Sequence, residues 1–133
     1  MIKLVKQEEA RGCGIACVAM VLGKSYKTVR NDFENDFEKK GLGFDKFIDY
    51  LLDHGLQAIK KEVRGWSHRD FARKEMLKPF APIHIINVQP QYDSKDRHAV
   101  VMDAKGKLYC PSGATEKEIR ETYIIHEVAG FWK

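Results

Sequence analysis

The sequence predicts an α+β fold in which N-terminal helices pack on a C-terminal antiparallel β-sheet. In the first half, apolar residues recur at helical spacing, whereas the second half contains short apolar runs separated by turn residues. No linker, repeat or low-complexity segment interrupts the 133 residues, and 44% of them are hydrophobic, which is enough for one core. We therefore expect a single domain over residues 1–133, with helices and strands segregated along the chain.

The first half is expected to be mainly helical. The segment after Gly12 is apolar on every side, which predicts a helix that runs through the core rather than over the surface. Ser25 is a typical N-cap, and the inward face of the helix it begins is continued by Phe37. In order, we expect a short strand over residues 2–5, a helix over 13–22 that ends at Gly23, a helix over 25–33, and a helix over 44–54 closed by Gly55.

The second half is expected to be rich in strands. Pro79 and Pro82 separate a helical pattern from a clear buried strand, and Lys105-Gly106 marks the turn of a hairpin. In order, we expect an exposed lysine-rich strand over 56–63, a helix that begins at Ser67 and ends before Pro79, a strand over 82–88, a polar loop over 89–97, hairpin strands over 98–102 and 107–110, a helix over 114–122 and a strand over 123–132.

Cys13 stands at the predicted start of the buried helix, between Gly12 and Gly14. The positive end of a helix dipole and the unpaired N–H groups of the first turn favour thiolate over thiol, so a cysteine here can act as a nucleophile. Glycines on both sides suit close packing against another segment equally well. Cys17, one turn further on, is expected to be a small hydrophobic residue of the core.

His98 opens the predicted hairpin and could supply the base that this thiol needs. With the turn near residue 105, paired residues have numbers that sum to about 208 to 210, which places His98 opposite Cys110 or Pro111. An imidazole beside a thiol takes its proton, and the thiolate attacks an acyl carbon. A third group normally accepts from the other ring nitrogen, and this position is held by Cys110.

Gln7 could complete such a site, because its amide can donate to an oxyanion together with the backbone N–H of Cys13. The motifs are Gln7…Gly12-Cys13-Gly14-x-Ala16-Cys17-x-Ala19-Met20, then His98-x-Val100-Val101, then Tyr109-x-Pro111. In order and spacing they resemble the papain-like cysteine peptidases that remove double-glycine leaders from bacteriocins and related peptides. The chain has no membrane-spanning run and no ATP-binding motif, so we expect a stand-alone relative rather than part of an export transporter.

The resemblance implies a papain-like fold in which Cys13 is the nucleophile, His98 the general base and Gln7 the oxyanion donor. It implies cleavage of a peptide or isopeptide bond after small residues such as glycine, through a thioester on the cysteine, with no cofactor. The family has Asp-Pro where this sequence has Cys110-Pro111. A thiol accepts more weakly than a carboxylate, and loss of the orienting acid costs orders of magnitude in rate. Ser112, Asp96 and Asp103 are the alternative acceptors.

Three other functions use the same residues. An acyltransferase would have the thioester captured by an amine instead of water. A pseudo-peptidase would keep the groove and bind a peptide or protein partner, with Cys110 marking the loss of catalysis. A redox protein would oxidise Cys13 and Cys110 reversibly.

Composition argues against other classes of partner. The net charge of +4 is small and its lysines and arginines are interleaved with acidic residues, which is typical of a mixed surface rather than of a nucleic-acid footprint. With no signal peptide or membrane span, we expect a cytoplasmic protein with reduced thiols, no membrane partner and a peptide or protein substrate. The spacing of cysteines and histidines predicts no metal site. His84 is expected to be a core histidine, His54 a helix-end residue, His126 a surface or sheet residue, and Trp66 a packing residue.

Overall fold

The computed structural model describes residues 2–33, 43–62, 74–90 and 97–133. Its elements are α1 (Cys13–Leu22), α2 (Tyr26–Arg30), α4 (Phe44–Asp53), β1 (Gln57–Glu62), β2 (Ile83–Gln89), β3 (His98–Asp103), β4 (Leu108–Tyr109), α6 (Glu116–Thr122) and β5 (Ile124–Trp132). The expectations for Phe37, Trp66, Asp96 and the start of the helix at Ser67 lie outside the described residues.

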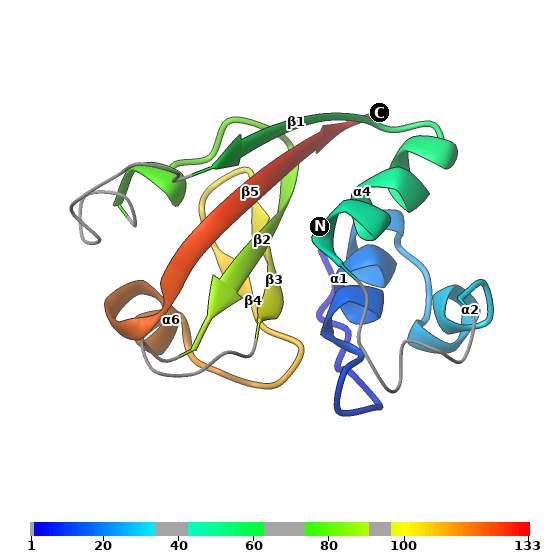
Figure 1. Cartoon of the computed structure of the whole chain (residues 1–133), viewed down its shortest axis with the longest axis horizontal. Coiled ribbons are helices and arrows are strands. Elements are labelled where there is room, and N and C mark those ends of the chain that lie inside the picture. The colour runs from blue at the N-terminus through cyan, green and yellow to red at the C-terminus, as the bar shows by residue number, and fades with distance from the viewer. Residues whose placement is uncertain (1, 34–42, 63–73, 91–96) are drawn as a thin grey trace.

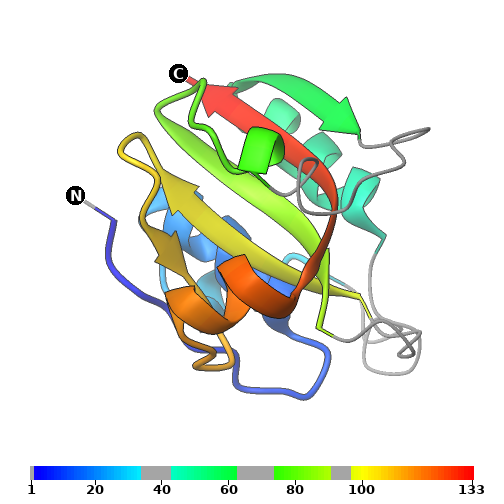
Figure 2. The same cartoon turned by 90° about the vertical axis from the view of Figure 1, so that its left-hand side faces the viewer.

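The strands form one antiparallel sheet in the order β1-β5-β2-β3-β4. Helices α1, α2 and α4 lie on one side of this sheet, and α6 lies on the other (Figure 1). Viewed from the side, α6 crosses the sheet beside the β3–β4 hairpin, and the N-terminal segment runs along the same edge (Figure 2). The predicted fold class, helices of the first half packed on an antiparallel sheet, is confirmed.

Both faces of the sheet are buried along β2 and β3, which explains the nearly unbroken apolar runs of these strands, whereas β1 is exposed. Along β3, Ala99 and Val101 belong to the core that contains α1, whereas Val100 and Met102 belong to a second core that contains Ile119 of α6. Successive side chains of a strand point to opposite faces, so each face takes every second residue. A strand with only one buried face would instead show alternation of apolar and polar residues.

Helix α1 forms the centre of the first core, as its all-round apolar pattern predicts. Its residues from Gly14 to Met20 are buried, and the helix ends at Gly23, whose φ of 67° is the left-handed conformation that glycine adopts without a Cβ clash. Phe47 of α4 packs directly on Gly14, where a Cβ would lie within 2.5 Å of three of its ring atoms. Gly14 therefore lets α4 approach the helix that begins at Cys13.

Several element boundaries differ from expectation. Residues 2–5 form no strand, because Ile2 and Val5 pack on the first core without pairing to a strand edge. Helix α2 ends at Arg30, and strand β4 has only two residues. Strand β4 is short because Pro111, which is separated from its end by Cys110 alone, has no N–H to donate to a neighbouring strand.

Candidate active site

Cys13 is the first residue of α1 and its side chain is half-buried. Gly12 precedes it as the N-cap and has no side chain that could accept a hydrogen bond from the first turn. The first N–H groups of an α-helix have no acceptor within the helix, so the N–H of Cys13 itself is a candidate donor to an incoming carbonyl oxygen. Local structure thus places a thiol beside a backbone donor.

The loop before Cys13 is held by a polar clamp. Glu9 Oε1 accepts hydrogen bonds from the Tyr26 hydroxyl at 2.9 Å and from Arg30 Nε at 3.0 Å, both on α2. Gly12 packs against the same tyrosine, and a Cβ there would overlap the hydroxyl oxygen. The clamp therefore fixes the turn from which α1 starts.

His98 is the first residue of β3, the strand on which α1 packs. Its Nε2 atom lies 3.3 Å from Cys110 Sγ and 3.2 Å from Ser112 Oγ. The Cys13 thiol also lies close enough to the His98 imidazole to raise its pKa. Because Nε2 faces Cys110 and Ser112, Nδ1 is the nitrogen left for Cys13. One imidazole thus connects two thiols from distant parts of the chain.

These contacts change the proton affinities of both groups. Burial lowers the pKa of His98, but hydrogen bonds to Cys110 and Cys13 and the negative charge of their thiolates outweigh it and raise the pKa to about 9. Burial raises the pKa of Cys110, whereas hydrogen bonds from His98 and Ser112 bring it down to about 7. Burial raises the pKa of Cys17 well above its usual range, which fits the expectation that Cys17 is a core residue.

The contact between His98 and Cys110 is diagonal rather than directly across the hairpin. Val101 pairs with Tyr109 and Met102 with Leu108, so a continued ladder would place Cys110 opposite Val100. The paired numbers sum to 210, at the upper end of the expected range, which places His98 opposite Ser112 rather than Cys110 or Pro111. Side chains two residues apart on a strand share a face, so Cys110 still reaches His98.

Gln7 lies beside this pair but its amide is engaged by the backbone. The backbone N–H of Gln7 donates to Pro111 O at 3.2 Å, which ties the N-terminal segment to the end of the hairpin. Its Nε2 atom donates to Glu9 O at 3.0 Å and to Ala10 O at 3.1 Å, and its buried Oε1 has no hydrogen-bond partner among the described residues. Two carbonyl acceptors fix the nitrogen on that side.

Ser112 is a site residue whose closeness to both His98 and Cys110 the sequence did not predict. The sequence offers it only as an alternative acceptor for His98, whereas the structure places its hydroxyl 3.2 Å from both His98 Nε2 and Cys110 Sγ. The available signal is its position in the turn Pro111-Ser112-Gly113, which brings residue 112 back over residue 110. Asp103 lies at the other end of β3, where it accepts from the backbone N–H groups of residues 105 and 107.

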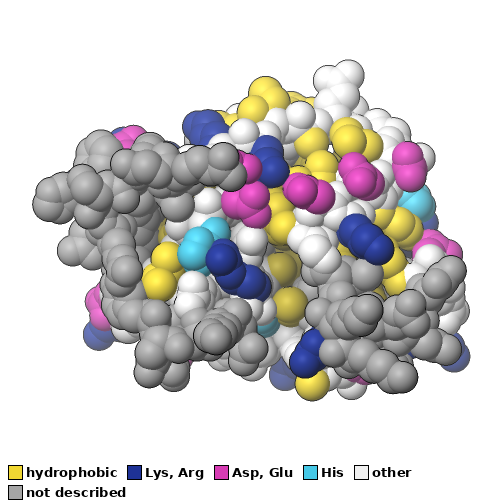
Figure 3. Space-filling model, viewed as in Figure 1, with side chains coloured by type: hydrophobic (Ala, Val, Ile, Leu, Met, Phe, Trp, Pro, Cys, Tyr) yellow, Lys and Arg dark blue, Asp and Glu magenta, His cyan; other side chains and the backbone are white. Residues whose placement is uncertain are grey.

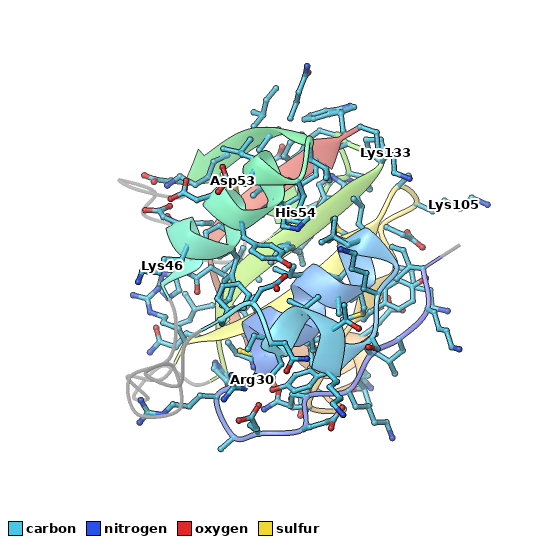
Figure 4. The ribbon with its side chains drawn as sticks, turned by 90° about the vertical axis from the view of Figure 1, so that its right-hand side faces the viewer. Arg30, Lys46, Asp53, His54, Lys105 and Lys133 are labelled. Carbon is cyan, nitrogen blue, oxygen red and sulfur yellow. The ribbon has the colours of Figure 1, made fainter. Side chains whose placement is uncertain are left out.

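The remaining histidines lie elsewhere. His84 is fully buried: its Nε2 accepts from the backbone N–H groups of Phe80 and Ala81, which leaves Nδ1 to donate to Met102 O, as expected for a core histidine. His54 follows α4 at an exposed position (Figure 4). His126 contacts the Gln89 side chain.

Charged side chains of both signs are interspersed on the face drawn in Figure 3. Within the described ranges, no group of three histidine, cysteine, aspartate or glutamate side chains is arranged to hold a metal ion. Among the described helices, none combines the length and apolar character needed to cross a membrane.

No protein-family model and no curated protein sequence matches this chain. Among solved structures, it is similar to the peptidase domain of Streptococcus ComA, which is described as a bi-functional ABC transporter involved in a quorum sensing pathway. That similarity has a TM-score of 0.58 at 15% sequence identity and covers 98% of each chain. The protein therefore has the fold of a bacterial peptidase domain, as its motifs predicted.

Proposed function

We propose that this protein is a cysteine peptidase that cleaves a peptide or isopeptide bond through a thioester on Cys13. The observation that carries the proposal is the closeness of the His98 imidazole to the Cys13 thiol, which stands at the start of a helix in a chain with a peptidase-like fold. A thiol, an imidazole and a backbone N–H that can bind the oxyanion are the parts that acyl transfer requires.

Each proton in the reaction is carried by His98. The proton of Cys13 passes to the imidazole, which gives a thiolate and an imidazolium, and the thiolate attacks the carbonyl carbon of the substrate. The oxyanion is stabilised by the N–H of Cys13 at the start of α1. The imidazolium then donates its proton to the leaving amine, which departs and leaves the thioester. A water molecule gives its proton to His98, attacks the thioester, and releases the acid and the free thiol.

The proposed substrate has small residues such as glycine before the cleaved bond. This preference is what the sequence resemblance implies. Gln7 is the proposed second oxyanion donor. In that role its amide has to release Glu9 O or Ala10 O, to which both amide hydrogens now donate. Capture of the thioester by an amine would use the same atoms and give acyl transfer.

A second candidate is a peptide-binding module without catalysis. The engaged amide of Gln7 favours it, because an oxyanion site without this donor is weaker by roughly 2.7–4 kcal/mol. It would keep the peptide site beside α1 and use no thioester.

Cleavage of a synthetic peptide mixture, followed by mass spectrometry, tests the proposal. The mixture contains peptides with Gly-Gly at the centre and matched peptides with Leu-Leu. We expect cleavage after glycine that Cys13→Ala abolishes and that the matched core variant Cys17→Ala retains. Added amine would reveal acyl transfer as a new amide product. Binding of the Gly-Gly peptides without cleavage would support the binding module and contradict the peptidase.

A further inference from the structure

Three groups that can donate hydrogen bonds converge on the Cys110 sulfur. His98 Nε2 lies 3.3 Å away, the Ser112 hydroxyl oxygen lies 3.2 Å away, and the backbone N–H of Ser112 also hydrogen-bonds the sulfur. A backbone N–H can only donate, so the sulfur accepts at least that bond. A neutral thiol is a weak acceptor, whereas charge-assisted bonds to an anion are about twice as strong as neutral ones. The surroundings of Cys110 therefore suit a thiolate.

We propose that Cys110 works as a thiolate, the anionic partner that orients His98, and that Ser112 is a positioning residue that keeps it in that form. This inference rests on the proposed function, because it concerns the same imidazole. In this form the sulfur accepts the hydrogen bond from His98, for which a neutral thiol is too weak an acceptor. Ser112 supplies the two donors that His98 does not, its hydroxyl and its backbone N–H.

The electrostatics of the site agree with this assignment. Cys110 is buried, and an isolated buried anion is costly, so its charge has to be matched by the imidazolium of His98. The pKa of Cys110 lies near 7 and that of His98 near 9, which leaves both groups ionised between those pH values.

Among the described residues, three other titratable groups face the pair. Cys13 and Cys17 lie on α1, and Tyr123 lies just after α6. Burial and the nearby thiolates raise the pKa of Cys17, and burial and the charge of Cys110 raise the pKa of Tyr123, so both stay protonated near neutral pH. Of these three groups, Cys13 is the one that, like Cys110, raises the pKa of His98.

Ultraviolet absorbance of the thiolate, followed over pH in the variant Cys13→Ala, tests the inference directly. Because Cys17 stays protonated, Cys110 is the thiol that titrates in this range, and we expect a midpoint near 7. Adding Ser112→Ala should move that midpoint toward ~8.5, the value of an ordinary cysteine. Ser112 is exposed, so this variant should fold. Adding Cys110→Ser should remove the transition, and adding Cys17→Ala should leave it in place.

A midpoint at or above ~8.5 in Cys13→Ala, or one that Ser112→Ala leaves unchanged, would overturn the inference. Either result would indicate that Cys110 is a neutral thiol. This titration needs no substrate, so its outcome is independent of whether the protein cleaves peptides. If cleavage is observed, the acid limb of its pH–rate profile supplies a second readout. Cys110→Asp should shift that limb down by more than one pH unit, because a carboxylate ionises near ~3.9, and Cys110→Ser should lower the rate at every pH.

Discussion

Gly14→Ala tests how closely α4 packs behind the Cys13 thiol. In a helix interior, alanine is favoured over glycine by about 1 kcal/mol. Here the new Cβ would lie within 2.5 Å of three ring atoms of Phe47, whereas ordinary contacts are 3.4–4 Å. The ring is 5% exposed and has little space into which it can retreat, and overpacking of this kind costs about 1–3 kcal/mol. We expect a net loss of about 1 kcal/mol in the free energy of unfolding.

Urea denaturation of Gly14→Ala, Phe47→Leu and the double variant measures this loss as a double-mutant cycle. Phe47→Leu alone should cost about 1–2 kcal/mol, because a smaller side chain leaves space beside Gly14. The alanine should fill that space in the double variant, with a favourable coupling of about 1–2 kcal/mol. If Gly14→Ala alone raised stability by about 1 kcal/mol, helix propensity would dominate, and the close approach of α4 would be refuted.

Three further predictions concern stability measured by urea denaturation. Burial lowers the pKa of His84, so the unfolded chain binds a proton that the folded protein does not. Its contribution is complete above pH ~6.5 and is lost as the pH falls. Wild type should therefore lose more stability between pH 7 and 5 than His84→Gln, and equal losses would contradict this. Thr115→Ala should cost about 1 kcal/mol, because Thr115 Oγ1 accepts from the Glu118 N–H as the N-cap of α6; an unchanged midpoint would exclude that role. Tyr26→Phe should cost about 1 kcal/mol through its lost bond to Glu9, and no cost would show that Arg30 suffices.

Local patterns predict most elements but not how they assemble. The apolar residues of α1 and the left-handed Gly23 are both readable from neighbouring residues. The strand order is not, because the pairing of β5 with both β1 and β2 depends on contacts between distant segments. The expected strand over residues 2–5 is wrong for the same reason. The alternation of apolar residues with lysines in this segment does not show whether a neighbouring strand has an edge available for pairing.

The site shows a similar division. A helix start and a hairpin start predict that Cys13 and His98 can meet, and hairpin spacing brings Cys110 near the imidazole. The direction of the Gln7 amide depends on two loop carbonyls, and the approach of Ser112 depends on a turn at Gly113 with φ of 90°. Such orientations follow from tertiary packing, which single-sequence patterns do not encode.

The position of β5 has a consequence for how this chain is made. Strands β1 and β2 leave the ribosome well before β5, yet in the sheet β5 lies between them. Until it arrives, both keep an unpaired edge that can join to another chain. The β2–β3–β4 segment that carries His98 can pair earlier, because its contacts are closer in sequence. Synthesis that stops short of β5 would therefore yield an aggregation-prone chain rather than a smaller working domain.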